Sequence, residues 1–474
     1  MTSALKDIFS RQKKAFRAQP YPSHHVREAL LNKCIQLLSA HHHAISEAER
    51  KDFGCRPSLV SNMNDVLPSL MALKHAKKHV AKWMRPKKKS VPLIMRLTGA
   101  KATLHYQPKG VVGIICPWNM PMTVMFGPLA DALAAGNRVM IKVSEFCPAT
   151  SALTHKLFAE TFPEEEIAVI QGGEDEAKAF CQLPFDHLVF TGSTHVGRQV
   201  MKAAAENLTP VTLELGGKCP AVFSNTADWE SALEKCLIGK TMNAGQVCIT
   251  ADYCFVPEDK LESCIDTLRD NFMRFFPKGA NSPDYVSIIN DRHLTRLTNL
   301  VDEAIEAGCR VICCDTNNTD WQQRNTARKF PLHLVVNPDD TLGVRKEEIF
   351  GPILPIITYR DFSEVINTIN HGDRPLACYY FGKSAKEVDR LTHETHAGGM
   401  SINDIAVHYA CHDLPFGGVG HSGQGQLHGI YGFQSLSHAK GRFSQGWVNL
   451  SKVSGLYPPY TDKAVKLIQG MLKP

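Results

Sequence analysis

Short apolar strands alternate with helical segments between residues 111 and 206, and this pattern constrains the fold more than any other feature of the chain. The predicted strands cover residues 111–116, 138–142, 167–170 and 188–191, and the predicted helices cover residues 122–135, 151–161, 174–181 and 194–206. Strands that alternate with helices predict βαβ units and a parallel sheet. Such sheets bind nucleotides at the carboxyl ends of their strands. We therefore expect an α/β fold with a ligand site at that edge.

The rest of the sequence predicts more than one domain, because 474 residues exceed the size of a single ordinary core. Residues 25–84 are expected to be largely helical, since apolar residues recur there at three- and four-residue spacing. From about residue 219 the alternation repeats more loosely, with helices predicted at 229–244, 261–276 and 295–307 and a strand at 253–256.

Composition and charge place the chain among soluble globular proteins, with 43% hydrophobic and 21% charged residues. A net charge of +6 is mildly basic and does not indicate a nucleic-acid binder. Basic residues concentrate between Lys74 and Lys89. We interpret this run as a solvated helix face and its exit loop, with an anion-binding patch as the alternative.

The fifteen cysteines are scattered, odd in number and never spaced as Cys-x-x-Cys, so we expect a reduced cytoplasmic protein. Residues 1–19 lack the apolar core of a signal peptide, and no run of 18 apolar residues predicts a membrane span. His41, His42 and His43 face different directions on a helix and have no cysteine or carboxylate partners in the sequence, so we predict no metal site.

The segment after Tyr460 predicts an amphipathic helix. Its apolar face consists of Ala464, Val465, Leu467, Ile468, Met471 and Leu472, and Lys463, Lys466 and Lys473 lie among its polar positions. We expect this helix to dock on the protein's own surface. Peripheral attachment to an anionic membrane is the alternative, because the segment is too short to span a bilayer.

Two short blocks offer groups for covalent chemistry. Glu214 stands in Leu-Glu-Leu-Gly-Gly-Lys, and Cys248 ends Asn-Ala-Gly-Gln-Val-Cys. A thiol that can become a nucleophile, together with a carboxylate that can activate water, suffices for attack on a carbonyl carbon followed by hydrolysis. Taken alone, the cysteine is more readily explained as a small buried hydrophobe and the glutamate as a solvated loop charge.

The neighbouring motifs change the interpretation of Cys248 and Glu214. With the blocks Pro117-Trp118-Asn119-Met120-Pro121 and Phe190-Thr191-Gly192-Ser193-Thr194, four motifs occur in one order, and the chain from residue 106 to residue 443 resembles the aldehyde dehydrogenase superfamily. The resemblance implies NAD(P)-dependent oxidation of an aldehyde to a carboxylic acid. It assigns Cys248 as nucleophile and Glu214 as base. Asn119 and the Cys248 N–H would hold the oxyanion.

The resemblance also implies a domain plan for this α/β chain. A Rossmann-type parallel-sheet NAD-binding domain is expected at residues 1–97 and 109–218, and an α/β catalytic domain at 219–418. Small β oligomerisation elements are expected at 98–108 and 419–450, followed by a C-terminal extension at 451–474. A β-hairpin near 98–107 and the segment near 432–443 would form the contact of a homodimer.

Cofactor residues follow from the same resemblance. Lys142 and Glu145 would reach the adenine ribose, and Glu145 would repel a 2′-phosphate, so NAD is preferred although NADP is possible. Glu348 would bind the nicotinamide ribose, with Phe350 near the nicotinamide. The pyrophosphate would meet the start of the helix at 194–206 through Gly192, Ser193 and Gly197. The literal Gly-x-Gly-x-x-Gly at 418–423 has no βαβ unit after it and is interpreted as unrelated to the cofactor.

Substrate residues are expected around the same motifs, namely Met120, Thr123, Val124, Val247 and Ile249. The sequence is most similar to the class 3 branch, and within it to bacterial coniferyl aldehyde dehydrogenases. This implies aromatic or medium-chain aliphatic aldehydes. An acylating relative that passes the acyl group to coenzyme A, or a non-enzymatic binding protein, remains the alternative, and the presence of Glu214, Cys248 and Asn119 argues against both.

Overall fold

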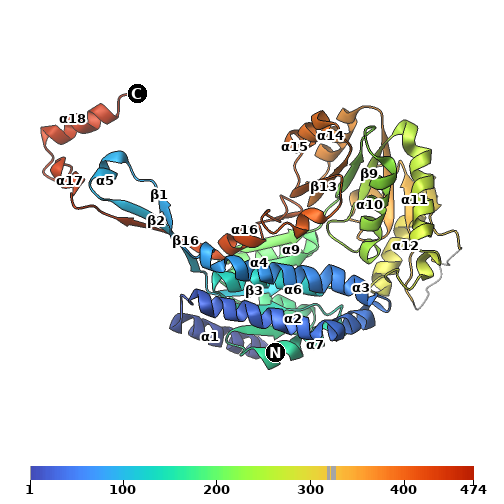
Figure 1. Ribbon diagram of the computed structural model, residues 1–474, viewed down its shortest axis with the longest axis horizontal. Helices are drawn as coiled ribbons and strands as arrows, with labels where there is room; N and C mark the ends of the chain where they lie inside the picture. The colour runs from blue at the N-terminus through green and yellow to red at the C-terminus, as the bar shows by residue number, and fades with distance from the viewer. Residues whose placement is uncertain (1, 318–320, 322–326) are drawn as a thin grey trace.

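The computed structural model describes residues 2–317, 321 and 327–474. Two α/β bodies pack against each other, and a slender arm projects from the first of them (Figure 1). The arm comprises residues 85–108 and 437–474 and carries the C-terminus at its far end. The predicted α/β fold with parallel sheets is confirmed.

The first body is built on a six-stranded sheet in the order β15-β7-β6-β3-β4-β5. Its strands are β3 (Val111–Ile115), β4 (Arg138–Lys142), β5 (Ile167–Ile170), β6 (His187–Gly192), β7 (Val211–Leu215) and β15 (Gly423–Gln424). All neighbours are parallel except β15, which places Gly423 antiparallel to Glu214 on β7. The Gly-rich segment at 418–423 is therefore a turn that leads onto the sheet edge.

Helices cover both faces of this sheet, which explains why its strands are apolar on both sides. Val112 and Ile114 of β3 face one cluster, while Val111 and Ile115 face the other. The first cluster lies under α2 (His24–Phe53), α4 (Leu67–Trp83), α6 (Pro121–Ala135), α7 (Pro148–Thr161) and α16 (Gly429–Ser435), and the second under α1 (Thr2–Ala18), α8 (Glu174–Cys181) and α9 (Thr194–Ala205). Between α2 and α4 lie the short elements α3 (Ser58–Ser61) and η1 (Asn62–Val66).

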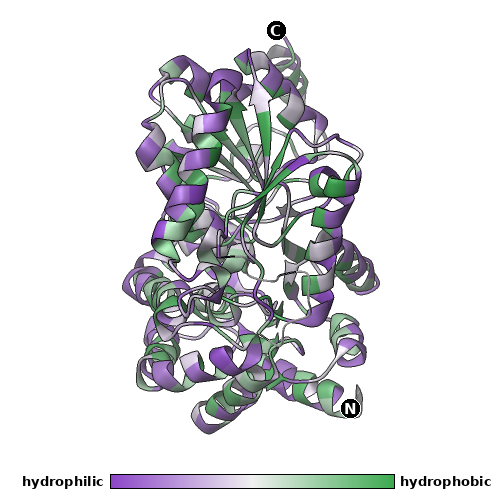
Figure 2. Cartoon of the chain, turned by 90° about the vertical axis from the view of Figure 1, so that its right-hand side faces the viewer, coloured by the Kyte–Doolittle hydropathy of each residue, from purple (hydrophilic) through white to green (hydrophobic). Residues whose placement is uncertain are grey.

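The second body holds a seven-stranded sheet in the order β10-β11-β12-β9-β8-β13-β14, in which only the β10–β11 pair is antiparallel. Its strands are β8 (Pro220–Phe223), β9 (Tyr253–Pro257), β10 (Arg310–Cys313), β11 (His333–Val336), β12 (Ile353–Tyr359), β13 (Ala377–Phe381) and β14 (Gly399–Ile402). Its α-helices are α10 (Trp229–Thr241), α11 (Leu261–Phe275), α12 (Asp291–Glu306), α13 (Gly343–Lys346), α14 (Phe362–His371) and α15 (Ala385–Glu394). Figure 2 shows hydrophobic strands enclosed by helices with hydrophilic outer faces.

Two helix predictions in this body need correction. The helix predicted at 229–244 ends at Thr241, because Asn243 and Ala244 adopt positive φ angles of 49° and 52° in the η2 segment (Met242–Gly245). The helix predicted from residue 295 begins at Asp291, where the Asn290 side chain accepts a hydrogen bond from the His293 N–H. Asn at such an N-cap position starts a helix before its apolar periodicity becomes visible.

The arm is an antiparallel sheet in the order β1-β2-β16, formed by β1 (Lys87–Lys89), β2 (Lys101–Pro108) and β16 (Ser437–Ser444). The β-hairpin predicted near 98–107 is present: β2 pairs antiparallel with β1 across α5 (Leu93–Leu97), and it also pairs antiparallel with β16 along its whole length. The predicted exit loop of the basic run likewise includes β1.

The C-terminal part of the arm contains α17 (Leu450–Val453) and α18 (Asp462–Met471). The predicted docking of this last helix on the enzyme's own surface is wrong. Only Ala464 of its apolar face is buried, whereas Met471 and Leu472 are 71% and 77% exposed. Across residues 2–317, 321 and 327–474, the helices are too short or too polar to cross a bilayer. The domain boundaries proposed above stay a prediction.

Candidate active site

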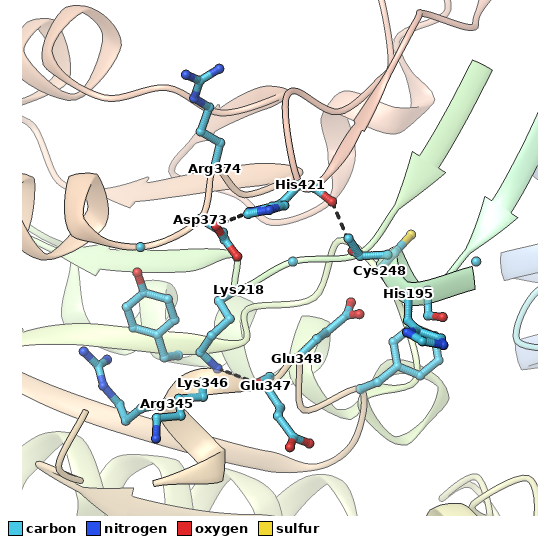
Figure 3. A pocket seen from close by; sticks show the side chains of 18 of the residues that line it. His195, Lys218, Cys248, Arg345, Lys346, Glu347, Glu348, Asp373, Arg374 and His421 are labelled. Atoms are coloured by element: carbon cyan, nitrogen blue, oxygen red, sulfur yellow. Dashed lines mark hydrogen bonds and ion pairs between the residues drawn. The ribbon is translucent and has the colours of Figure 1, made fainter. Parts of the chain in front are cut away.

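A cavity of about 1400 Å³ opens between the two bodies and joins several of the predicted site residues. Its walls include Asn119, Glu214, Cys248, Glu348 and Phe350. Gly192 and Ser193 at the end of β6, and Val124 of α6, also line it. Figure 3 shows Cys248 and Glu348 near one another, with His195 from the start of α9 beside them. Residues distant in sequence thus share one site.

Asn119 is held in the short segment between β3 and α6. The side chain is 4% exposed, and its Nδ2 donates a hydrogen bond to the Gln246 carbonyl over 3.2 Å. Its own backbone carbonyl accepts hydrogen bonds from Asn243 Nδ2 at 3.1 Å and from Arg56 Nη1 at 2.9 Å. The amide therefore faces the Cys248 loop with its backbone fixed.

The loop before Cys248 has an unusual backbone. Asn243, Ala244 and Gly245 have successive φ angles of 49°, 52° and 74°, in the left-handed region that costs free energy for residues other than glycine. Gln246 compensates, since its Nε2 donates to the carbonyls of Asn243 and Ser287 at 2.9 and 3.1 Å. A tightly bonded, strained loop is a common setting for a functional side chain.

Burial dominates the acid–base properties of the site. It raises the pKa of the Cys248 thiol to about 12, and the charges of Glu348 and Glu214 add to the effect. Burial alone raises the pKa of Glu214 well above its ordinary value. Among the residues that the structure describes, neither carboxylate oxygen of Glu214 has a hydrogen-bond partner. Such a carboxylate can take a proton from a small molecule in the cavity.

The first-body wall suits a nucleotide. Ser193 caps α9 by accepting a hydrogen bond from the Val196 N–H, and the positive end of this helix faces the cavity through Thr194 and His195. Gly197 permits close packing, since a Cβ there would lie 2.6 Å from Leu215. These features fit a pyrophosphate.

The side of the cavity formed by the second body brings Glu348 against the side formed by the first body. A Cβ on Gly216 would lie 1.9 Å from a Glu348 carboxylate oxygen, so only glycine admits this approach. Burial, followed by the nearby charge of Asp252, raises the pKa of Glu348 to about 8. Lys218 ties the walls together by donating to the carbonyls of Val344 and Glu347, each at 2.9 Å. The Glu348 side chain can accept hydrogen bonds from the hydroxyls of a ribose bound in the same cavity as the thiol.

Lys142 and Glu145 are not among the residues that line this cavity. The Lys142 ammonium donates to the carbonyls of Val143 and Gly172 at 2.6 and 2.7 Å and lies 3.9 Å from a Glu145 oxygen. Glu145 is partly exposed, with 40% of its side chain accessible. Both stay candidates for the adenosine end of a bound dinucleotide.

The predicted substrate residues separate into two groups. Val124 lines the cavity, whereas Met120, Thr123, Val247 and Ile249 are buried outside its lining. The Thr123 hydroxyl donates to the carbonyls of Asn64 and Asp65, which turns it toward η1 rather than toward a substrate. This correction could not be foreseen, because helical spacing gives the direction of a side chain but not its partner.

Sequence reasoning also missed residues that hold the site together. Gln246 belongs to the recognised Cys248 block and could have been singled out there. Arg56 and Asp65 carry no motif, and their contact with the Asn119 segment depends on how α2 and α4 cross over α6. Only the folded chain brings them together.

One cavity of an α/β fold thus holds a thiol, a helix N-terminus and a carboxylate that has no hydrogen-bond partner among the described residues. This combination defines an enzyme that joins covalent chemistry to a nucleotide. The model of the Aldehyde dehydrogenase family matches residues 2–441. The chain is 45% identical over 472 residues to a probable coniferyl aldehyde dehydrogenase of Caulobacter vibrioides, covering 99% of this chain and 97% of that protein. It is 35% identical over 448 residues to aldehyde dehydrogenase family 3 member H1 of Arabidopsis thaliana, covering 94% and 90%.

A solved structure is also similar to this chain. The structure described as the substrate-bound state of Staphylococcus aureus AldH matches with a TM-score of 0.91 and 35% identity, and the match covers 99% of each chain. The chain therefore belongs to the aldehyde dehydrogenase family, and the prediction from the four motifs is confirmed. It is an oxidoreductase that converts aldehydes to acids with a nicotinamide cofactor.

Proposed function

We propose that Cys248 is the nucleophile of this oxidation. Its thiol first loses its proton to solvent, and the thiolate sulfur adds to the aldehyde carbon. The developing oxyanion would accept hydrogen bonds from Asn119 Nδ2 and from the Cys248 N–H. Glu348 would hold the nicotinamide ribose of a bound cofactor and the α9 N-terminus its pyrophosphate, and the cofactor would supply the hydride acceptor. Loss of hydride from the substrate carbon leaves a thioester on Cys248.

Hydrolysis completes the proposed cycle. Glu214 takes a proton from water, the water oxygen attacks the thioester carbon, and the carbon–sulfur bond breaks to release the acid and the thiolate. The observation that carries this proposal is the Glu214 carboxylate, which is buried in the same cavity as Cys248 and has no partner for either oxygen among the described residues. A dedicated base favours hydrolysis over acyl transfer to coenzyme A.

The proposed substrate is an aromatic aldehyde such as coniferyl aldehyde. Support comes from the similarity to the Caulobacter protein and from the apolar residues that line the cavity with the thiol, Trp118, Val124 and Phe350. NAD is the proposed cofactor, since the exposed carboxylate of Glu145 would repel a 2′-phosphate. All fifteen cysteines are free thiols, which supports a reducing, cytoplasmic location.

We further propose a homodimer in which the arm contacts the partner subunit. The arm exposes Leu97, Phe443 and Trp447 to the extent of 71%, 57% and 82%. Apolar surface of this extent marks a site of protein association. The domain plan of residues 1–97 with 109–218, 219–418, 98–108 with 419–450, and 451–474 is retained as part of the same proposal.

A kinetic panel tests the function. NADH formation would be measured with cinnamaldehyde, coniferyl aldehyde, octanal and acetaldehyde, each with and without coenzyme A. We expect acid as the product, no dependence on coenzyme A, and a higher kcat/KM for the aromatic aldehydes, because burying apolar surface is worth about 25 cal/mol per Å². Equal kcat/KM for acetaldehyde and cinnamaldehyde would contradict the substrate class, and an acyl-coenzyme A product would contradict hydrolysis.

A further inference from the structure

A fully buried arginine lies outside the cavity, behind Asn119. Arg56 follows α2, and its side chain is 0% exposed. A buried charge is unfavourable unless it is paired and hydrogen-bonded, so its partners define what it does. The cavity lining does not include Arg56, and the proposed reaction does not use it.

The guanidinium bonds in two directions. Nη1 donates to the Asn119 carbonyl at 2.9 Å, and Nη2 donates to Asp65 Oδ2 at 2.6 Å. Nε lies 3.4 Å from Glu49 Oε2, and the group stacks over the Phe53 ring with its carbon 4.8 Å from the centroid. The planar fork of an arginine is needed to make both hydrogen bonds at once.

Asp65 extends this arrangement into the helix that follows Asn119. Its Oδ1 accepts hydrogen bonds from the N–H groups of Met122 and Thr123 at 3.1 and 2.9 Å. These groups belong to the first turn of α6, whose N-cap residue, Met120, offers no side-chain acceptor. One arginine–aspartate pair therefore fixes both the Asn119 backbone and the start of the next helix.

We propose that Arg56 is a positioning residue that sets the Asn119 amide for the oxyanion, with Asp65 as its anchor. This inference rests on the oxyanion role given to Asn119 in the proposed function. One hydrogen of Asn119 Nδ2 is directed to the Gln246 carbonyl, so the other reaches the reacting oxygen only if the Asn119 backbone is held in place. A displacement of about 1 Å in such a group costs about a hundredfold in rate.

A double-mutant cycle tests the coupling. The rate of the first NADH burst would be measured with cinnamaldehyde and saturating NAD for the wild type, Arg56→Met, Asn119→Ala and the double variant. We expect Asn119→Ala to slow the burst by about 10²- to 10³-fold. Arg56→Met should slow it by roughly tenfold or more in the wild type and by less than about twofold beside Asn119→Ala, because a residue that acts through Asn119 has nothing left to position.

The opposite end of α6 supplies a matched control. Arg27 is also 0% exposed, and its Nη1 donates to the Ala134 carbonyl at 2.8 Å, near the last turn of the same helix. Arg27→Met removes an equivalent buried guanidinium, so it should lower thermal stability without slowing the burst. NAD binding would be checked by fluorescence in every variant. If Arg56→Met fails to fold, Arg56→Lys replaces it, since one ammonium cannot keep both contacts in place.

The outcomes separate the two ideas. If Asn119→Ala keeps a wild-type burst, the proposed oxyanion role fails, whatever Arg56 does. If Asn119→Ala slows the burst but Arg56→Met slows it equally in both backgrounds, or no more than Arg27→Met, the positioning role of Arg56 is overturned. A burst defect at Arg56 that disappears in the Asn119→Ala background establishes it.

Discussion

The cavity and the arm each contain side chains in an unfavourable environment, but the kind of side chain differs between the two regions. In the cavity they are polar, since the buried Glu214 has no hydrogen-bond partner among the described residues. In the arm they are apolar, as Leu97, Trp447 and Leu472 are each more than 70% exposed. Buried polar groups without partners indicate a site for water or a small molecule, whereas exposed apolar groups indicate a protein surface.

Charge sharpens the contrast. Residues 85–108 and 437–474 contain twelve lysines and arginines in the sequence but only one carboxylate side chain, Asp462. Three of these lysines form the edge strand β1, where their positive charge disfavours pairing with a strand of another chain. We therefore expect substitutions in the cavity to alter the reaction rate, and changes to the arm to alter the association of subunits.

The largest effect is expected for Cys248→Ala. This variant should lose dehydrogenase turnover, to below about a hundredth of the wild-type kcat, because no covalent intermediate can form. NAD binding should be retained, since the thiol holds no cofactor. Steady-state NADH formation and fluorescence titration check the two halves. Cys411→Ala, which removes an exposed thiol, is the matched control and should keep full activity.

Glu214→Gln should separate the two halves of the reaction. Acylation should still give one burst of NADH per site, followed by stalled turnover, since the thioester then lacks its base. Stopped-flow measurement of NADH checks this. Glu347→Gln, which changes an exposed carboxylate of the same cavity, should keep both phases. Loss of the burst in Glu214→Gln would mean that this carboxylate acts mainly on the thiol.

The pH profile should follow from burial. Because burial raises the pKa of Cys248 to about 12 and that of Glu214 above its usual range, both groups are protonated more than usual at neutral pH. Thiolate and free base become more abundant as pH rises, so kcat/KM should increase from pH 6 to pH 9, by up to roughly tenfold per unit. NAD affinity at each pH is the control. A flat profile would contradict this account of the two groups.

The parts of the fold and of the site that depend on local sequence patterns could be predicted. The strands between 111 and 215 follow from apolar runs, and the reactive residues follow from blocks such as the one ending at Cys248. The sequence could not show that Asn243 and Ala244 leave the helical region, because their conformation depends on contacts made by Gln246. Nor could it show Thr123 turned toward η1 or the apolar face of α18 left open, since both depend on tertiary packing.

The smallest effect on catalysis is expected from the arm. A chain ending at Tyr460 lacks α18 and should dimerise more weakly than the intact protein while its kcat per site stays within about twofold. Sedimentation of both forms, with and without anionic vesicles, measures this. We expect the intact protein to be a dimer that ignores vesicles. A monomeric intact protein would contradict the dimer, and co-sedimentation with vesicles that is lost on truncation would assign α18 to a membrane surface.

The central claim is that Cys248 carries the acyl group as a thioester and that water deprotonated by Glu214 hydrolyses it. Trapping the acyl group on Cys248 tests this claim most directly. Glu214→Gln would be mixed with cinnamaldehyde and NAD, quenched in acid and analysed by peptide mass spectrometry, with Cys248→Ala treated alike. The account predicts that the peptide containing Cys248 gains the mass of one cinnamoyl group in Glu214→Gln and that no peptide gains it in Cys248→Ala. An acyl group on another cysteine, or NADH formation with no acylated peptide, would contradict it.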